Sequence, residues 1–208
     1  MRPVLTLETY RPPEGATPSV SVDPDVRSSL LGLARLSLAV ATGRAGAAAL
    51  DQALAQAPDG ETQGGVFVTL TKGGDLRGCI GNLEPGRPLR TAVVMAALGA
   101  ALDDPRFLPV TAGELPLIRI DISVLGAALP LGDPDVFQPG VDGVMVERGG
   151  RRGLLLPEVA TEFSWGATQM FEAVCRKVGL PPDAWREPGT TMRSFRTTRF
   201  GGPAVTTH

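Results

Sequence analysis

The chain has 208 residues, of which 43% are hydrophobic and 20% are charged, with 20 lysines and arginines against 22 acidic residues. This globular composition predicts one domain, or one domain with a subsidiary lobe, that is long enough to bury a core without disulfides. The formal net charge of −2 lacks the basic excess that proteins need to bind nucleic acid through its phosphates, so we expect no nucleic-acid partner.

Residues that carry nucleophilic, acid–base or metal chemistry are few. The two cysteines, Cys79 and Cys175, do not make a secreted disulfide framework, and the only histidine is His208, the last residue. A catalytic triad or dyad that needs an internal histidine is therefore excluded, and so is a zinc site rich in histidine or cysteine. We expect no metal site, and the sequence leaves the cofactor unknown.

Signals for secretion and for membrane insertion are not found in the sequence. From Met1 the chain leads directly into proline- and glutamate-containing sequence, without the apolar stretch of a signal peptide. The longest apolar run, Val93 to Leu102, is about half as long as a membrane span. We therefore expect a soluble, cytoplasmic protein with no membrane partner.

The N-terminal part is predicted to contain an arm and two helices. Residues 1–20 are rich in Pro, Thr and Glu and predict a flexible arm. Asp23 and Pro24 predict the start of a helix with Asp23 as its N-cap, and apolar residues recur at helical spacing as far as Val40. A shorter, alanine-rich helix is expected over Gly46–Ala57.

A hairpin and a third helix are expected next. Val66–Thr71 is rich in β-branched residues and predicts a strand, and Asp75–Ile80 is expected to return as the second arm of a hairpin. Gly73-Gly74 supplies the turn between them. A helix is expected over Pro88–Leu102, and Asp104-Pro105 ends it.

The second half of the chain is predicted to add further antiparallel strands. Residues 117–125 predict a strand that has Ile118, Ile120 and Ile122 on one face and Arg119, Asp121 and Ser123 on the other. A second hairpin is expected from Val144–Val146 and Gly153–Leu156, with Gly149-Gly150 as its turn. A helix is then expected over Thr168–Val178 and a final strand over Thr191–Phe200.

Hairpins outnumber strand–helix–strand crossovers in this order of elements. We therefore expect an α+β fold, with a mainly antiparallel sheet flanked by helices. A glycine- and proline-rich stretch after Leu129 predicts a crossing between two lobes, a main lobe of about residues 21–128 and 183–208 and a smaller lobe of about residues 129–182.

The segment Leu76–Gly81, with the sequence LRGCIG, carries the strongest functional signal. Alternation along a strand puts Arg77 and Cys79 side by side on one face, and a guanidinium near a thiol favours the reactive thiolate. Gly78 and Gly81 leave room for the close approach of a ligand or of another backbone segment. The alternative is that Cys79 is a small buried hydrophobe, as many free cysteines are.

Three further residues are candidates for a functional site, and each has a structural alternative. Asp104 follows a helix C-terminus, where its charge opposes the helix dipole, so it is a candidate catalytic carboxylate. Equally, Asp104 caps the turn that it makes with Pro105. Arg106 suits an anion clamp, or an ion pair with a neighbouring aspartate. Trp165 is a candidate stacking platform, or a packing residue.

The LRGCIG segment resembles the hallmark of the AMMECR domain family, whose bacterial and archaeal members are called AmmeMemoRadiSam system protein A. The resemblance extends from about Val66 to Phe195 and includes a second motif, Asp104–Pro109. Further matching segments are Glu114-Leu115, Ile122–Leu125, Gly143–Val146, Leu155–Ala160 and Lys177–Leu180. The chain departs from the family pattern at three places. It has Ala96-Ala97 where relatives often carry Asn-Ala, and Asp142-Gly143 where they often carry His-Gly. It has Ser164-Trp165-Gly166 where they often carry Gly-Trp-Asp.

The resemblance implies a larger and a smaller lobe, with a cleft between them that the cysteine motif lines. Together with the residues above, it makes Cys79, Arg77 and Asp104 the catalytic candidates. The ligand-binding candidates are Gly78, Ile80, Gly81, Arg106, Phe107, Ser123 and Trp165. Members of the family often lie beside, or are fused with, Memo-type and radical-SAM proteins, so we expect these as partners, and a small-molecule ligand in the cleft.

Two classes of function are compatible with these residues. The first is an enzyme that acts on a small or nucleotide-like substrate, with Cys79 as nucleophile and Arg77 as its electrostatic partner. The second is a non-catalytic ligand-binding or adaptor module. The lack of an internal histidine as base argues against the first, whereas the concentration of distinctive residues in one strand and one loop exceeds what packing alone requires.

Overall fold

The computed structural model describes residues 20–58, 65–83 and 86–205. Nearly all of the expected arm, residues 1–20, lies outside the described residues, and so does His208. The chain divides into two compact units, each described by itself: a large unit within Val20–Gly126 and Thr197–His208, and a small unit within Ala127–Arg196.

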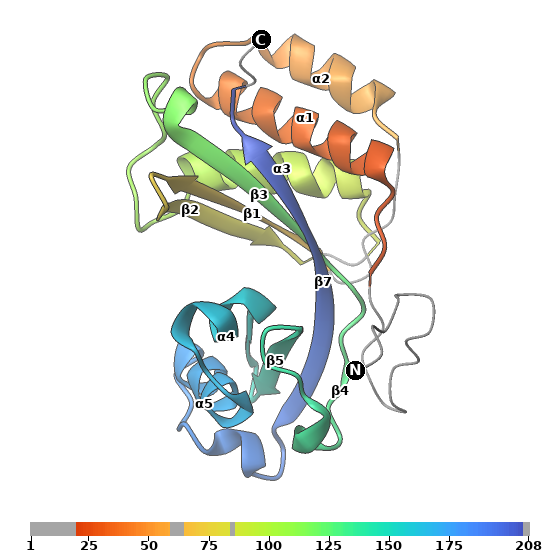
Figure 1. Ribbon diagram of the computed structural model, residues 1–208, viewed down its shortest axis with the longest axis vertical. Helices are drawn as coiled ribbons and strands as arrows, with labels where there is room; N and C mark the ends of the chain where they lie inside the picture. The colour runs from red at the N-terminus through yellow and green to blue at the C-terminus, as the bar shows by residue number, and fades with distance from the viewer. Residues whose placement is uncertain (1–19, 59–64, 84–85, 206–208) are drawn as a thin grey trace, which may run out of the picture. The chain divides into compact units, whose positions relative to one another are not determined.

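Helices of the large unit begin and end close to where the sequence predicts them (Figure 1). They are α1 (Pro24–Ala41), α2 (Ala47–Gln56) and α3 (Leu89–Leu102), followed by a single 3-10 turn at Leu115–Leu117. The predicted N-cap of α1 is confirmed, because Asp23 accepts a hydrogen bond of 2.8 Å from the backbone N–H of Asp25. Within the described ranges, no helix combines the length and the apolar character needed to cross a membrane.

The sheet of the large unit is antiparallel, with the strand order β2-β1-β3-β7. Its strands are β1 (Gly65–Lys72), β2 (Asp75–Asn82), β3 (Ile118–Leu125) and the second part of β7 (Thr191–Pro203). The predicted hairpin of β1 and β2 is confirmed, and Gly73 and Gly74 turn it with φ angles of +62° and +97°. β2 comes first in this order, so it is an edge strand.

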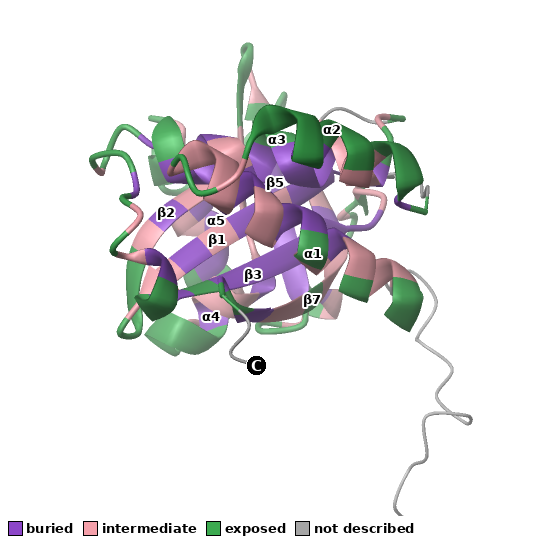
Figure 2. Ribbon diagram, turned by 90° about the horizontal axis from the view of Figure 1, so that it is seen from above, coloured by how far each residue is buried: buried purple, intermediate pink, exposed green. Residues whose placement is uncertain are grey.

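The core of the large unit lies between this sheet and the helices α1 and α3. Along β1, Val66, Val68 and Leu70 are fully buried on the helix side, whereas Phe67 and Thr69 on the opposite face are half-buried, an alternation visible in Figure 2. Burial of each such aliphatic side chain contributes about 1.5–3 kcal/mol, which fixes the register of the strand. We call the face of this sheet opposite α1 and α3 the polar face.

The small unit packs two helices and an antiparallel sheet around a core of its own. Its strands are β4 (Leu129–Pro130), β5 (Asp142–Arg148), β6 (Arg151–Leu155) and the first part of β7. Its helices are α4 (Pro157–Phe163) and α5 (Ala167–Lys177). Single 3-10 turns lie at Pro134–Val136 and Ala184–Arg186. The predicted hairpin of β5 and β6 and the helix α5 are confirmed. β4 and α4 are additions to the expected elements.

β7 is longer than predicted and belongs to both units. It has 13 residues; its first part pairs with β4 and β5, and its second part, from Thr197, pairs with β3. The final strand, which the sequence placed in the main lobe, therefore contributes to the small unit as well. The antiparallel α+β fold class is confirmed, whereas the expected cleft between the lobes stays a prediction.

Candidate functional site

The backbone of Cys79 is held by two charged side chains from the segment that follows α3. Cys79 lies on the edge strand β2, where its N–H donates to Oδ2 of Asp104 at 2.8 Å and its C=O accepts from Nη2 of Arg106 at 3.5 Å. These are the groups that a further strand would satisfy with its own backbone. Side chains of residues 104 and 106 therefore cover this point of the sheet edge.

Asp104 and Arg106 are bound to each other as well as to Cys79. Oδ1 of Asp104 accepts from the backbone N and Nε of Arg106 at 3.1 and 2.9 Å, and Oδ2 accepts from Nη2 at 2.7 Å. These hydrogen bonds hold the pKa of Asp104 well below its ordinary value, although burial acts in the opposite direction. Asp104 is therefore ionised at neutral pH, and its geometry suits the positioning of Cys79 rather than proton donation.

The Cys79 thiol is half-buried and has one polar side-chain neighbour on the next strand. Its sulfur lies 3.3 Å from Oγ1 of Thr69, the residue directly opposite it on β1. The pKa of Arg106 is raised, chiefly by its hydrogen bond to Asp104 and, as a smaller contribution, by the charge of Cys79. Arg106 is thus the guanidinium that contacts the backbone of Cys79.

Arg77 is engaged elsewhere, so the expected pair of Arg77 and Cys79 needs correction. Its guanidinium donates to both carboxylate oxygens of Glu114, at 2.9 and 3.2 Å. In the strand register, Leu70 pairs with Gly78 and Thr71 pairs with Leu76, so Arg77 is an extra residue at a β-bulge. A bulge breaks the strict alternation from which the pair was inferred.

Glu114 is the centre of a dense set of hydrogen bonds. Besides Arg77, it accepts from Lys72 Nζ at 3.1 Å and from the backbone N and Oγ1 of Thr111 at 2.9 and 3.0 Å. Hydrogen bonding from Arg77 is the main cause that holds the pKa of Glu114 well below its ordinary value. Arg77 and Glu114 therefore tie the β1–β2 hairpin to the segment before β3.

The two glycines of the LRGCIG segment are explained by contacts within the protein. A Cβ at Gly78 would lie 2.1 Å from the backbone oxygen of Ala100 in α3, and one at Gly81 would lie 2.4 Å from the ring of Phe67. Of the two alternatives, Gly78 thus serves the close approach of another backbone segment. Ile80 packs against the core of the large unit rather than on the polar face.

On the polar face, Cys79 stands in a row of residues that crosses the sheet. Thr69 pairs with Cys79 on one side and with Asp121 on the other, and Asp121 pairs with Gly201 on β7. A Cβ at Gly201 would lie 2.4 Å from Oδ1 of Asp121, so the carboxylate lies over this glycine. Ser123, a ligand-binding candidate, is buried on the same strand, two residues from Asp121.

Two arginines bind the Asp121 carboxylate at the far end of this row. Nε of Arg119 lies 3.3 Å and Nη2 of Arg199 lies 3.4 Å from Oδ2. The alternation of residues 117–125 places Asp121 on the correct face, so a sequence argument could have found it. Arg199 comes from β7, whose pairing with β3 no local pattern reveals.

The remaining aromatic candidates have packing partners. The ring of Phe107 lies beneath two guanidiniums, with its centroid 5.5 Å from Cζ of Arg106 and 5.9 Å from Cζ of Arg77. Trp165 belongs to the small unit, where it stacks on Phe163 with centroids 4.8 Å apart and packs against the core. The structure therefore places Trp165 among packing contacts of the small unit.

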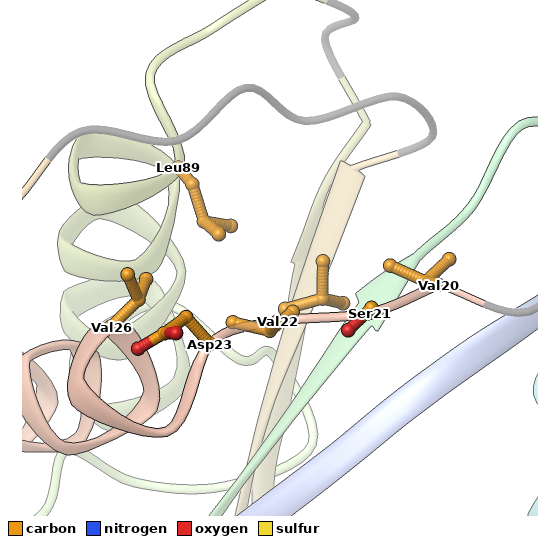
Figure 3. A pocket seen from close by; sticks show the side chains of 7 residues that line it. Val20, Ser21, Val22, Asp23, Val26 and Leu89 are labelled. Carbon is orange, nitrogen blue, oxygen red and sulfur yellow. The ribbon is translucent and has the colours of Figure 1, made fainter.

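A cavity of about 190 Å³ lies in the large unit, at the start of α1 (Figure 3). Its lining is mostly apolar and consists of Val20, Ser21, Val22, Asp23, Val26, Leu89 and Val124. None of these is a candidate site residue. In the part of the chain that the structure describes, no three His, Cys, Asp or Glu side chains gather as a metal site would require.

Comparison with known proteins gives a consistent family assignment. A protein of Methanothermobacter thermautotrophicus is 49% identical over 142 residues, which cover 65% of this chain and 74% of the relative. A protein of Methanocella arvoryzae is 42% identical over 154 residues, which cover 68% of this chain and 78% of the relative. The crystal structure of the uncharacterized protein PH0010 from Pyrococcus horikoshii matches with a TM-score of 0.73 and 30% identity, covering 89% of this chain and 96% of that one. The family model described as AMMECR1 matches residues 31–200. The chain therefore belongs to the AMMECR1 family, and the family predicted from the LRGCIG segment is confirmed.

Proposed function

We propose that the protein is a thiol-dependent enzyme that acts on a small molecule, with Cys79 as its nucleophile. The observation that carries the proposal is the way in which Cys79 is held. A buried carboxylate and its guanidinium partner fix the backbone of a half-buried cysteine, and a hydroxyl lies 3.3 Å from its sulfur. Burial of a charge is costly, so packing alone does not account for this arrangement.

The neighbours of the sulfur suit a nucleophilic role without an internal histidine. The Thr69 hydroxyl is able to donate to the thiolate, and the guanidinium of Arg106 is held at the backbone of the same cysteine. In the proposed step the sulfur of Cys79 forms a bond to an electrophilic carbon of the substrate, the leaving group departs with its electron pair, and the thiol proton passes to solvent.

Alkylation of the native protein tests this proposal. Cys79 is half-buried, whereas Cys175 is fully buried and burial raises the pKa of its thiol, so iodoacetamide should label Cys79 much faster near neutral pH. Thr69→Val should slow the labelling of Cys79 severalfold by removing the hydroxyl, and Thr71→Val, two residues along the same strand, should not. Equal labelling of both cysteines, and only after denaturation, would end the nucleophile proposal.

A second candidate function is an adaptor, which exposed leucines of the large unit favour. Leu108 is 83% exposed, Leu117 is 61% exposed and Leu76 is 41% exposed. They come from segments that the bonds of Arg77 to Pro109 and Glu114 tie together. Large exposed apolar side chains that are gathered on one part of a surface indicate a protein partner.

The resemblance to the AMMECR family makes Memo-type and radical-SAM proteins the proposed partners of such an adaptor. Co-elution of the purified proteins on size exclusion, compared with a Leu108→Asp variant, tests this role. Val205→Asp serves as the control, because Val205 is 45% exposed and lies near the C-terminus. Binding that Leu108→Asp abolishes and Cys79→Ser leaves unchanged favours the adaptor, and lack of any complex removes it.

A further inference from the structure

We infer that the substrate of the Cys79 site is an anion whose acidic group is held by Arg119 and Arg199. The inference deepens the proposed function and rests on it. The polar face has a thiol at one end of a cross-strand row and a pair of guanidiniums at the other end. Such an arrangement suits a molecule with an electrophilic carbon at one end and a carboxylate or phosphate at the other.

Charge on the polar face is exposed unevenly, because the carboxylates are buried and their guanidinium partners are not. The side chain of Asp121 is 8% exposed, whereas those of Arg119 and Arg199 are 57% and 44% exposed. The same holds at the thiol end, where Asp104 is 2% exposed and Arg106 is 53% exposed. A dissolved molecule that reaches this face therefore meets guanidiniums at both ends of the row.

The guanidinium of Arg119 has donors left for a ligand. It uses Nε and Nη2 on Asp121, and within the described residues no partner of its Nη1 is found. A guanidinium has five N–H donors in a rigid fork that matches carboxylate and phosphate oxygens. Because Asp121 already fixes the plane of the fork, little further ordering is needed when an anion binds.

The strand register gives the length of the molecule that would span the row. Cys79 and Asp121 both pair with Thr69, from opposite sides, so two strand spacings separate them. Neighbouring strands lie about 4.8 Å apart, which makes the span about 10 Å. The guanidiniums that would hold the anion lie a further 3.3–3.4 Å from the Asp121 carboxylate, so the reacting carbon and the anionic group of the substrate should be at least about 10 Å apart.

A series of ω-(iodoacetamido)alkanoates tests the inference as a molecular ruler. In each reagent the Cys79 sulfur bonds to the methylene carbon and iodide leaves, while the terminal carboxylate sits at a distance set by the chain length. At low salt the labelling rate should pass through a maximum at the length that reaches Arg119 and Arg199, about fivefold above the matching terminal amide. A parallel series with terminal phosphonates distinguishes phosphate recognition from carboxylate recognition.

Arginine variants decide whether the maximum comes from this site. Arg119→Gln and Arg199→Gln should remove the maximum and leave the rate with iodoacetamide itself unchanged, and Arg119→Lys should restore part of it. Arg176→Gln is the matched control, because Arg176 is 58% exposed and pairs with a single carboxylate, Glu172. Circular dichroism of each variant confirms that it is folded.

The outcomes separate this inference from the proposed function. A rate that does not depend on the length or charge of the reagent, with Cys79 still reactive toward iodoacetamide, overturns the anion inference alone. A maximum that survives in both glutamine variants overturns it as well. Failure of Cys79 to react with any of the reagents in the native protein removes the thiol-dependent enzyme and the inference that rests on it.

Discussion

Replacement of Asp104 by asparagine tests the edge cover at Cys79 with little change of shape. Asp104 accepts one hydrogen bond from Cys79 N and three from Arg106. Asparagine keeps one acceptor oxygen, so a donor on the covered sheet edge loses its partner, which costs about 1–3 kcal/mol. The lost ion pair adds at most about 1 kcal/mol, because Arg106 is half-exposed and water solvates it. We expect a total loss of about 1–4 kcal/mol.

The assay must report on the large unit. Both tryptophans, Trp165 and Trp185, lie in the small unit, so urea unfolding is better followed by circular dichroism than by fluorescence. With an m-value of about 2 kcal/mol/M, the expected loss lowers the urea midpoint by about 0.5–2 M. Amide exchange at Cys79 should become faster. Asp103→Asn is the control, since Asp103 is exposed. Equal urea midpoints for both variants, with an unchanged rate of amide exchange at Cys79, would refute this account.

Three further predictions concern acid stability, two glycines of the large unit and the end of α4. The pKa values of Asp104 and Glu114 are lowered in the folded state, so the unfolded chain binds more protons below about pH 4. The stability of the protein should therefore fall as pH decreases through this range. Glu114→Gln should flatten the fall of the urea midpoint between pH 2.5 and about 6. Gly78→Ala should destabilise the protein by about 2 kcal/mol or more, because the added methyl meets the backbone of α3. Gly32→Ala should stabilise the protein by about 0.5–1 kcal/mol in the same urea titration, because Gly32 lies in α1 with open space around it. Ser164 ends α4 with a φ of +53°, so Ser164→Gly should raise the unfolding free energy of the small unit by about 1 kcal/mol, as measured by tryptophan fluorescence.

Local patterns were sufficient to predict most elements of the fold. Alternation in residues 66–71 and the double glycine at 73 and 74 specify a hairpin, because β-branched residues suit strands and the turn needs positive φ. Asp23 before a proline likewise specifies the start of α1. α4 was missed because it has only seven residues, too few to show a helical period.

Contacts between distant segments explain what the sequence did not predict. The partner of Arg77 depends on a bulge of one residue in β2, which no alternation rule reveals. The two roles of β7 depend on pairing with strands more than 40 residues away in the chain, and so does the position of Arg199 beside Asp121. The family resemblance made Cys79 and Asp104 catalytic candidates together, but it did not predict that Asp104 binds the backbone of Cys79.

The residues of the LRGCIG segment differ in how fully the fold accounts for them. Gly78 and Gly81 make room for α3 and for Phe67, Ile80 packs into the core, and Arg77 ties the hairpin to Glu114. These roles need no ligand. The thiol of Cys79 is different, because its half-buried side chain contacts a hydroxyl and its backbone is fixed by a buried charge.

The means by which the sheet edge is covered bears on access to the thiol. A further strand beside β2 would satisfy the whole edge with backbone groups and no charge. Asp104 and Arg106 instead satisfy the N–H and C=O of one residue, Cys79, at the expense of burying a carboxylate. A cover of this kind holds one position firmly and brings a guanidinium to the backbone of the cysteine, which a strand would not. Stability alone does not require that choice, whereas a reactive thiol that must meet an anionic substrate does benefit from it.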